Sequence, residues 1–287
     1  MKIIRSITEM QDESDRIRRD GNTIGFVPTM GFLHEGHLDL LRLAIRRCDV
    51  TVCSIFVNPT QFGKEEDLAR YPRDFERDRT LIEALACDIL FTPDETEMYP
   101  EGYSTWVHVE GCTESLEGAF RPTHFRGVTT VVSTLFLAVR PHLAVFGQKD
   151  AQQLAVIRRM TRDLHFGVEI VAAPIRREKD GLAMSSRNTY LDEHERREAL
   201  ALFRSLQRAQ HMYSEGERDA ARIGDAVAEE ILRSGALTLD YAAVVHPDTM
   251  ERIDGVIDTP ALVVIAARIG STRLIDNIVL GSEGTSS

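Results

Sequence analysis

Short apolar runs alternate with longer amphipathic stretches between residues 8 and 172 of the chain. A short run that is apolar throughout predicts a strand covered on both faces, and apolar residues three or four positions apart predict one face of a helix. The predicted strands are residues 24–27, 50–57, 88–91, 143–146 and 168–172. The predicted helices are residues 8–20, 37–45, 74–86, 129–139 and 150–164. This alternation is typical of a parallel sheet whose strands are connected by crossover helices.

The pattern changes after Pro174. Residues 175–188 are polar and contain glycine, which is the composition of a mobile connection. Gly270-Ser271 indicates a hairpin near the end of the chain. The elements predicted in this part are helices at residues 193–213 and 219–234, then strands at residues 239–245, 261–267 and 273–279.

We therefore expect an α/β protein with two domains and a boundary near residue 187. Residues 1–187 are predicted to form a parallel-sheet domain, and residues 188–281 a smaller α+β domain. Residues 282–287 are small and polar, which predicts a disordered tail.

Composition and charge narrow the possible partners. The chain has 287 residues, of which 43% are hydrophobic and 28% charged, as in an ordinary globular protein. The net charge of −11 argues against a large nucleic-acid footprint. No apolar run approaches the length of a membrane span, and the N-terminal segment is charged and amphipathic, unlike a signal peptide. We expect a cytoplasmic protein with no nucleic-acid or membrane partner.

Residues 25–45 read as a strand, a loop broken by Gly31 and Gly36, and a helix. Such a loop presents backbone N–H groups and the positive end of a helix dipole, which together favour an anion such as a phosphate. His34 and His37 lie where the loop becomes the helix, and residues three apart in a helix can face the same side. Their imidazoles can donate hydrogen bonds to phosphate oxygens. A metal site is a weaker interpretation, and histidines that only cap the helix are the remaining alternative.

Two further segments suit phosphates. Gly147-Gln148-Lys149-Asp150 follows a predicted strand and opens a helix, so Lys149 can reach a phosphate while Asp150 orients a ribose, a metal or the lysine. A strand-end turn with a solvated lysine is the alternative. Met184-Ser185-Ser186-Arg187 offers two hydroxyls and a guanidinium that can clamp a triphosphate, or forms a plain polar linker. An early histidine loop with a late Met-Ser-Ser-Arg loop resembles the nucleotidyl-transferring Rossmann superfamily.

Several polar side chains have less specific interpretations. Gln61 and Gln153 can both donate and accept, which suits a small substrate with hydroxyl and carboxylate groups, although surface amides are the usual alternative. The loop at residues 121–127 can serve an anionic substrate or form a salt-bridged surface loop. A solvated helix face is expected from the charged residues Arg73, Asp74, Glu76, Arg77, Asp78 and Arg79.

Six stretches together resemble the pantoate–β-alanine ligase family. They occur in family order across residues 27–191, and the later LIDN is compatible with it. The stretches are VPTMGFLHEGH, SIFVNPTQF, DLARYPR, LEGAFRPTHFRGV, FGQKDAQQLAVIRRM and DGLAMSSRNTYL.

The resemblance implies a fold, a reaction and partners. The fold is a Rossmann-like parallel-sheet N-terminal domain with a smaller α+β C-terminal domain that works as a lid, usually in a homodimer. The reaction uses ATP and Mg²⁺ to convert (R)-pantoate into enzyme-bound pantoyl adenylate with release of pyrophosphate. The amine of β-alanine then attacks the adenylate, which gives pantothenate and AMP.

The resemblance also implies residue roles. His34, His37, Lys149 and Arg187 would hold the phosphates, and His37 would stabilise the departing pyrophosphate. Asn58, Gln61 and Gln153 would bind the small substrates, and Asp150 is the first candidate for Mg²⁺. The ATP-binding residues would be Met30, Gly31, Phe32, Leu33, His34, Glu35, Gly36, His37, Gly147, Gln148, Lys149, Asp150, Arg176, Met184, Ser185, Ser186 and Arg187.

Three positions depart from the family pattern: Thr60 replaces a methionine, Gln148 a glutamate, and Arg176 a residue that is commonly apolar. None of them removes a predicted phosphate ligand. Two other functions stay open at this point. One is a nucleotidylyltransferase whose product keeps the nucleotide, and the other is a catalytically silent nucleotide-binding protein.

Overall fold

The computed structural model describes residues 1–64 and 66–281. The chain forms two compact units. Of the described residues, the first unit consists of those in Met1–Gln148 and Val156–Pro174, and the second of Lys149–Ala155 and residues 175–281. Residues 175–187 thus pack with the second unit, whereas the sequence analysis assigned them to the first domain. The tail predicted at residues 282–287 lies outside the described residues.

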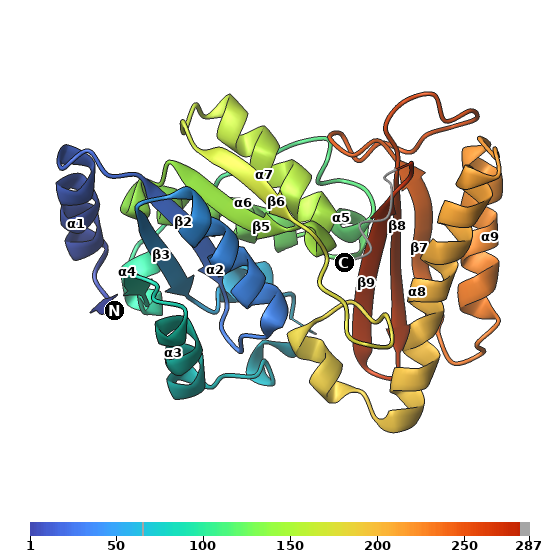
Figure 1. Cartoon of the computed structure of the whole chain (residues 1–287), viewed down its shortest axis with the longest axis horizontal. Helices are drawn as coiled ribbons and strands as arrows, with labels where there is room; N and C mark the ends of the chain where they lie inside the picture. Colours follow the sequence, from blue (N-terminus) through green and yellow to red (C-terminus); the bar gives the residue numbers. More distant parts are fainter. Residues whose placement is uncertain (65, 282–287) are drawn as a thin grey trace. The chain divides into compact units, whose positions relative to one another are not determined.

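The first unit contains a six-stranded parallel sheet with the strand order β1-β4-β3-β2-β5-β6 (Figure 1). The predicted parallel sheet is confirmed. Only β1 was not predicted, because three residues at a sheet edge leave too little periodicity to read. The strands are β1 (Lys2–Ile4), β2 (Ile24–Thr29), β3 (Val50–Ile55), β4 (Ile89–Phe91), β5 (Leu143–Gly147) and β6 (Glu169–Ala173).

The helices of this unit follow the predicted order. Short helices α4 and α5 were not predicted, and α6 begins five positions earlier than its apolar run, at His124 instead of Thr129. The helices are α1 (Ile7–Arg19), α2 (Glu35–Arg47), α3 (Phe75–Ala84), α4 (Glu95–Met98), α5 (Glu117–Phe120), α6 (His124–Val139) and α7 (Ala151–Asp163), of which α7 contributes its residues from Val156 onward to this unit.

Helices cover both faces of the sheet. Val27 on β2 packs in one apolar cluster with Leu41 of α2 and Ile82 of α3. The ring of Phe26, the preceding residue, packs edge-on against Phe136 of α6 with centroids 6.4 Å apart. Since successive strand residues point to opposite faces, α2 and α6 lie on opposite sides of the sheet. This double coverage explains why the central strands read as apolar runs.

Strand β2 continues through Pro28 to Thr29, beyond the predicted end at Val27. Pro28 has no N–H, but its carbonyl remains an acceptor, and it pairs in register with Ser54 of β3. Strand β5 pairs only with Gly25 and Phe26, so the proline lies where β2 has one sheet neighbour. The strand can therefore tolerate the missing donor.

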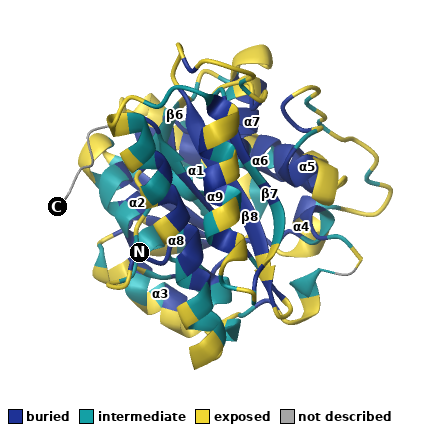
Figure 2. Cartoon of the chain, turned by 90° about the vertical axis from the view of Figure 1, so that its right-hand side faces the viewer, coloured by how far each residue is buried: buried dark blue, intermediate teal, exposed yellow. Residues whose placement is uncertain are grey.

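The second unit is an α+β structure, as predicted. Its antiparallel sheet has the order β7-β8-β9, and Ile269 pairs with Thr272 across the predicted hairpin. Helices α8 and α9 each present buried and exposed residues (Figure 2), and their buried side chains share a core with the sheet. The elements are α8 (Glu193–Ser214), α9 (Ala220–Leu232), β7 (Thr238–Val245), β8 (Leu262–Ile269) and β9 (Thr272–Val279).

The segment at residues 175–188 is folded, so its interpretation as a mobile connection was wrong. Its backbone turns back on itself, with Glu178 N–H donating to Leu182 O at 2.8 Å. The Arg177 guanidinium forms a bidentate pair with the buried Asp276 of β9, at 2.6 and 3.0 Å, and donates to Gly181 O at 3.1 Å. A bidentate pair has little freedom of orientation, and it holds the turn on β9.

Within residues 1–64 and 66–281, no helix is both long enough and apolar enough to cross a bilayer.

Gly181 offers a test of this turn. Its φ is +98°, and an added Cβ would lie 2.1 Å from Cδ1 of Phe203. Gly216 has the same φ of +98° with no atom within 4 Å of its Cβ position. We expect Gly216→Ala to lower the free energy of unfolding by about 1 kcal/mol through backbone strain alone. Gly181→Ala should cost about 3 kcal/mol because steric overlap is added. Urea denaturation measures both, and equal losses would contradict the packing against Phe203.

Candidate functional site

The two histidines meet at the start of α2. Helix α2 begins directly after His34, and His37 is its third residue. The two ring centroids are 4.0 Å apart, and His34 N–H donates to Nδ1 of His37 at 3.3 Å. Because Nδ1 accepts, the proton of a neutral His37 ring lies on Nε2, which is then a donor. The predicted placement of both imidazoles at a helix N-terminus is confirmed.

The loop before α2 is held by the buried carboxylate of Asp78. Gly31 and Phe32 adopt left-handed backbone conformations, with φ of +80° and +49°. Asp78 of α3 accepts from the N–H groups of Phe32 at 2.6 Å and Leu33 at 2.8 Å. Asp78 is only 1% exposed, so its assignment to a solvated helix face was wrong. Burial raises the pKa of Asp78, although both backbone N–H groups favour the ionised form.

A second loop follows β3. The Nδ2 amide of Asn58 donates to Gln61 Oε1 at 3.0 Å and to Gly127 O at 3.1 Å. Its Oδ1 accepts from the hydroxyls of Thr60 at 2.9 Å and Tyr99 at 2.8 Å. Asn58 is 1% exposed, and protein partners occupy both ends of its amide. Asn58 was expected to bind substrate, but these contacts suit it to holding Gln61.

Gln61 connects the two loops. Its Nε2 approaches Sδ of Met30 at 3.3 Å, so the segment after β3 touches the segment after β2. Both loops extend from the carboxyl ends of neighbouring parallel strands, where ligands bind in sheets of this kind. In the first unit the predicted residues Met30–His37, Asn58 and Gln61 therefore form one group.

Residues 121–127 contact this group through His124 and Gln61. Arg121 pairs with Glu66 at 2.7 Å and with Glu117 at 3.6 Å, as in the salt-bridged interpretation. The buried His124 contacts Gln61 O through Nδ1 at 3.0 Å and Arg121 through Nε2 at 3.2 Å. A carbonyl only accepts and a guanidinium only donates, so Nδ1 has the proton and Nε2 accepts. Burial, with the Arg121 charge adding to it, lowers the pKa of His124 to about 4.

Gly127 allows helix α6 to approach the Gln61 loop. A Cβ at Gly127 would lie 2.6 Å from Gln61 N and from the carbonyl oxygen of Thr60. Only glycine leaves room for this close backbone contact. In the sequence, Gly127 ends the loop at residues 121–127, and this position did not indicate what the glycine packs against.

In the second unit, β9 anchors both predicted phosphate segments. Asn277 Nδ2 donates to Lys149 O at 2.9 Å, and the neighbouring Asp276 holds the turn that leads to Met184. Met184 N–H donates to Arg176 O at 2.9 Å, so the backbone of Arg176 pairs with the Met-Ser-Ser-Arg segment. The LIDN motif was only noted as compatible with the family, yet two of its residues position these segments.

The remaining predicted residues have simple positions. Ser185 caps a short 3₁₀ helix, its Oγ accepting from Arg187 N–H at 3.3 Å, and Ser186 is buried. Gly147 ends β5, Asp150 is exposed and Gln153 is partly exposed on α7. Among the described residues, no group of three or more metal-ligating side chains occurs. Mg²⁺ that is bound to a nucleotide usually has one or two carboxylate ligands in addition to the phosphates. The single carboxylate of Asp150 is therefore compatible with such a site.

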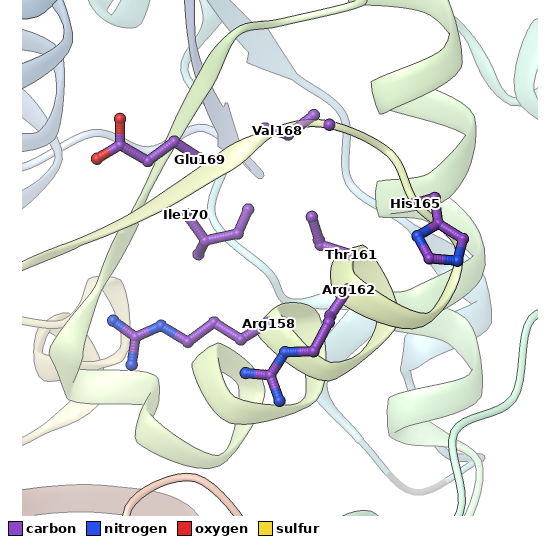
Figure 3. A pocket seen from close by; sticks show the side chains of 8 residues that line it. Arg158, Thr161, Arg162, His165, Val168, Glu169 and Ile170 are labelled. Carbon is purple, nitrogen blue, oxygen red and sulfur yellow. The ribbon is translucent and has the colours of Figure 1, made fainter.

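A separate hollow of about 580 Å³ lies beside the start of β6 (Figure 3). Arg158 and Arg162 of α7 line it together with Ile170 and the backbone region of Glu169 on β6. It contains none of the predicted site residues. Because it adjoins the amino end of β6, it lies away from the carboxyl-end loops of the sheet.

The parallel sheet and the loops at its carboxyl ends define a Rossmann-like α/β protein, with a separate α+β unit. The family model for pantoate-beta-alanine ligase matches residues 2–279. The chain therefore belongs to the pantoate–β-alanine ligase family and is an enzyme of that family.

Relatives support the assignment over nearly the full length. Pantothenate synthetase of Thermotoga petrophila is 53% identical over 281 residues, which cover 98% of this chain and 100% of the relative. A solved pantothenate synthetase from Thermus thermophilus is 46% identical, with a TM-score of 0.92 over 97% of this chain and 99% of that one. Pantoate-beta-alanine ligase from Francisella tularensis, solved with beta-gamma ATP and beta-alanine, is 30% identical, with a TM-score of 0.80 over 97% of both chains.

Asp78 provides a stability test. We expect Asp78→Ala to leave the N–H groups of Phe32 and Leu33 buried without an acceptor and to cost about 2–5 kcal/mol. Asp78→Asn keeps one acceptor oxygen and should cost roughly half as much. Asp74→Ala removes the ordinary cap of α3, an oxygen that accepts from Arg77 N–H, and serves as the control at about 1 kcal/mol. Urea denaturation gives the three values, and an Asp78→Ala loss no larger than the control would contradict this bracing role.

His124 predicts a dependence of stability on pH. The unfolded ring binds a proton near pH 6.5 and the folded ring near pH 4, so the native state is favoured fully above pH 6.5. As the pH falls from 6.5 toward 4, this contribution to the free energy of unfolding is lost. The total loss at the acid end is about 3 kcal/mol. We expect His124→Gln, whose amide can still donate to Gln61 O, to show a shallower decline between pH 7 and 5. Denaturation curves at several pH values measure this, and parallel declines would rule out His124 as the source.

Proposed function

We propose that the protein condenses (R)-pantoate with β-alanine at the expense of ATP, giving (R)-pantothenate, AMP and pyrophosphate through a pantoyl-adenylate intermediate. The observation that supports this most is the pair of imidazoles at the N-terminus of α2, joined through Met30 and Gln61 to the loop after β3. A helix N-terminus with N–H donors favours phosphate oxygens, and the adjoining amide suits a hydroxy acid.

The first step is attack of the pantoate carboxylate on the α-phosphorus of ATP. The bond between the α-phosphorus and the bridging oxygen breaks, and pyrophosphate leaves with the negative charge. In our proposal His34 and the Nε2–H of His37 stabilise that charge, and Lys149 and Arg187 neutralise the phosphates. Mg²⁺, bound by the phosphates and Asp150, would supply further positive charge.

The second step is attack of the β-alanine amine on the acyl carbon of the adenylate, with AMP as the leaving group. No covalent bond to the enzyme is needed, because adenylation has already activated the acid. Gln61 and Gln153 would bind the small substrates, and the mixed anhydride must be shielded from water. The lid role of the second unit, a homodimeric assembly and a cytoplasmic location stay predictions from the family resemblance.

A coupled assay for AMP tests the reaction. We expect AMP and pyrophosphate to be released over many turnovers only when ATP, pantoate and β-alanine are all present. A nucleotidylyltransferase would instead release pyrophosphate and a stable nucleotide conjugate, and a silent nucleotide-binding protein would release neither product.

His37→Ala tests the role of the imidazole. We expect kcat to fall by a factor of about 100 or more, equivalent to about 3 kcal/mol of transition-state stabilisation. His194→Ala, at an exposed position of α8, is the matched control and should retain kcat. An unchanged kcat in His37→Ala would remove this residue from the mechanism.

A further inference from the structure

The amide of Gln61 has a defined orientation. Gly127 O is a backbone carbonyl and can only accept, so the amide nitrogen of Asn58 must be the atom that faces it at 3.1 Å. The same nitrogen faces Gln61 at 3.0 Å, and its partner there must be an acceptor, Oε1. The Nε2–H groups of Gln61 therefore point to the opposite side, where Met30 lies.

Two hydroxyls hold the other end of the Asn58 amide. Tyr99 Oη donates to Asn58 Oδ1 at 2.8 Å, and Thr60 Oγ1 donates to the same oxygen at 2.9 Å. The hydroxyls lie 3.2 Å apart, and Thr60 N–H also approaches Oδ1 at 3.3 Å. With Oδ1 held in this way, the Asn58 side chain cannot turn away from Gln61 without losing several hydrogen bonds.

The Tyr99 ring is fixed by its neighbours. Tyr103 packs edge-on against it with centroids 5.0 Å apart, and Trp106 stacks at 6.4 Å. The guanidinium of Arg126 lies over the Trp106 ring at 4.9 Å, which ties this aromatic group to helix α6. Burial raises the pKa of Tyr99 to about 12, so its hydroxyl remains a donor at neutral pH.

We propose that Tyr99 and Thr60 are positioning residues that act through Asn58 to hold the Gln61 amide with its Nε2–H groups toward a hydroxyl or carboxylate oxygen of pantoate. This inference rests on the proposed function, in which Gln61 binds pantoate. The Thr60 hydroxyl donates to the same Asn58 oxygen as the Tyr99 hydroxyl does. The threonine therefore adds a second donor to the network in this chain, beside the one from Tyr99.

Kinetics with conservative variants test the proposal. Tyr99→Phe and Thr60→Val each remove one donor and leave the other, so each should raise KM for pantoate only roughly threefold. The double variant leaves Oδ1 with backbone contact only and should raise it by at least about tenfold, more than the two single effects combined. KM for ATP should change less than about twofold in all three, because the histidine loop is untouched.

Tyr103→Phe is the matched control, because its ring packs against Tyr99 while its hydroxyl takes no part in this network. It should leave both KM values unchanged. A double variant with an unchanged pantoate KM would overturn the proposal. So would one in which KM for ATP and KM for pantoate rise equally, since that result would indicate a general loss of structure.

A measurement without turnover separates this inference from the proposed function. Glutamine side chains labelled with ¹⁵N, with the Gln61 signals assigned through Gln61→Glu, report the amide directly. We expect those signals to shift and broaden in the double variant and to stay in place in Tyr103→Phe. Unchanged Gln61 signals in the double variant would overturn the positioning role. A wild-type protein that releases no pantoate-dependent AMP would instead overturn the proposed function.

Discussion

The histidine loop, residues 30–37, depends on the hydrogen bonds that its backbone donates to the buried carboxylate of Asp78. The chain leaves β2 through Gly31 and Phe32 in left-handed conformations, and the N–H groups of Phe32 and Leu33 have a side-chain acceptor instead of a backbone one. Buried N–H groups without acceptors cost more free energy than one ordinary hydrogen bond returns. Asp78 satisfies two of them from a helix 46 positions along the chain. Since α2 starts from this loop, the directions of both imidazoles follow from it.

The same principle governs the loop after β3 and the segments of the second unit. Asn58, the neutral His124 and the close approach of Gly127 together fix the Gln61 loop. On β9, Asn277 donates to the backbone of Lys149, and Asp276 pairs with the Arg177 side chain in the turn that leads to Met184. In each case a residue far away in the sequence completes the hydrogen bonds of a loop. The motifs contain several of these supporting side chains, but they do not indicate which loop each one holds.

The sequence predicted most of the fold because elements that are buried on one or both faces have apolar residues at a regular spacing along the chain. Among the described residues, every strand of four or more residues and every helix of eight or more was found. The largest displaced boundary was the start of α6, where His124, Arg126 and Gly127 interrupt the apolar pattern. Residues 175–188 could not be assigned correctly from the sequence, because a polar turn held by Arg177 has the same composition as a mobile linker. Asp78 was misread for a similar reason, since a carboxylate among arginines resembles a solvated helix face.

By itself the sequence determined the order of strands and helices, the parallel sheet, the family, and the residues whose chemistry suits phosphates and a hydroxy acid. These follow from periodicity and from local motifs, which are properties of neighbouring residues. Only the tertiary structure decided that Asp78 braces the histidine loop, that Asn58 faces Gln61 and not solvent, and that His124 stays neutral. The reason is physical: a polar side chain is defined by the partner that satisfies it, and that partner is brought close only when distant segments fold together.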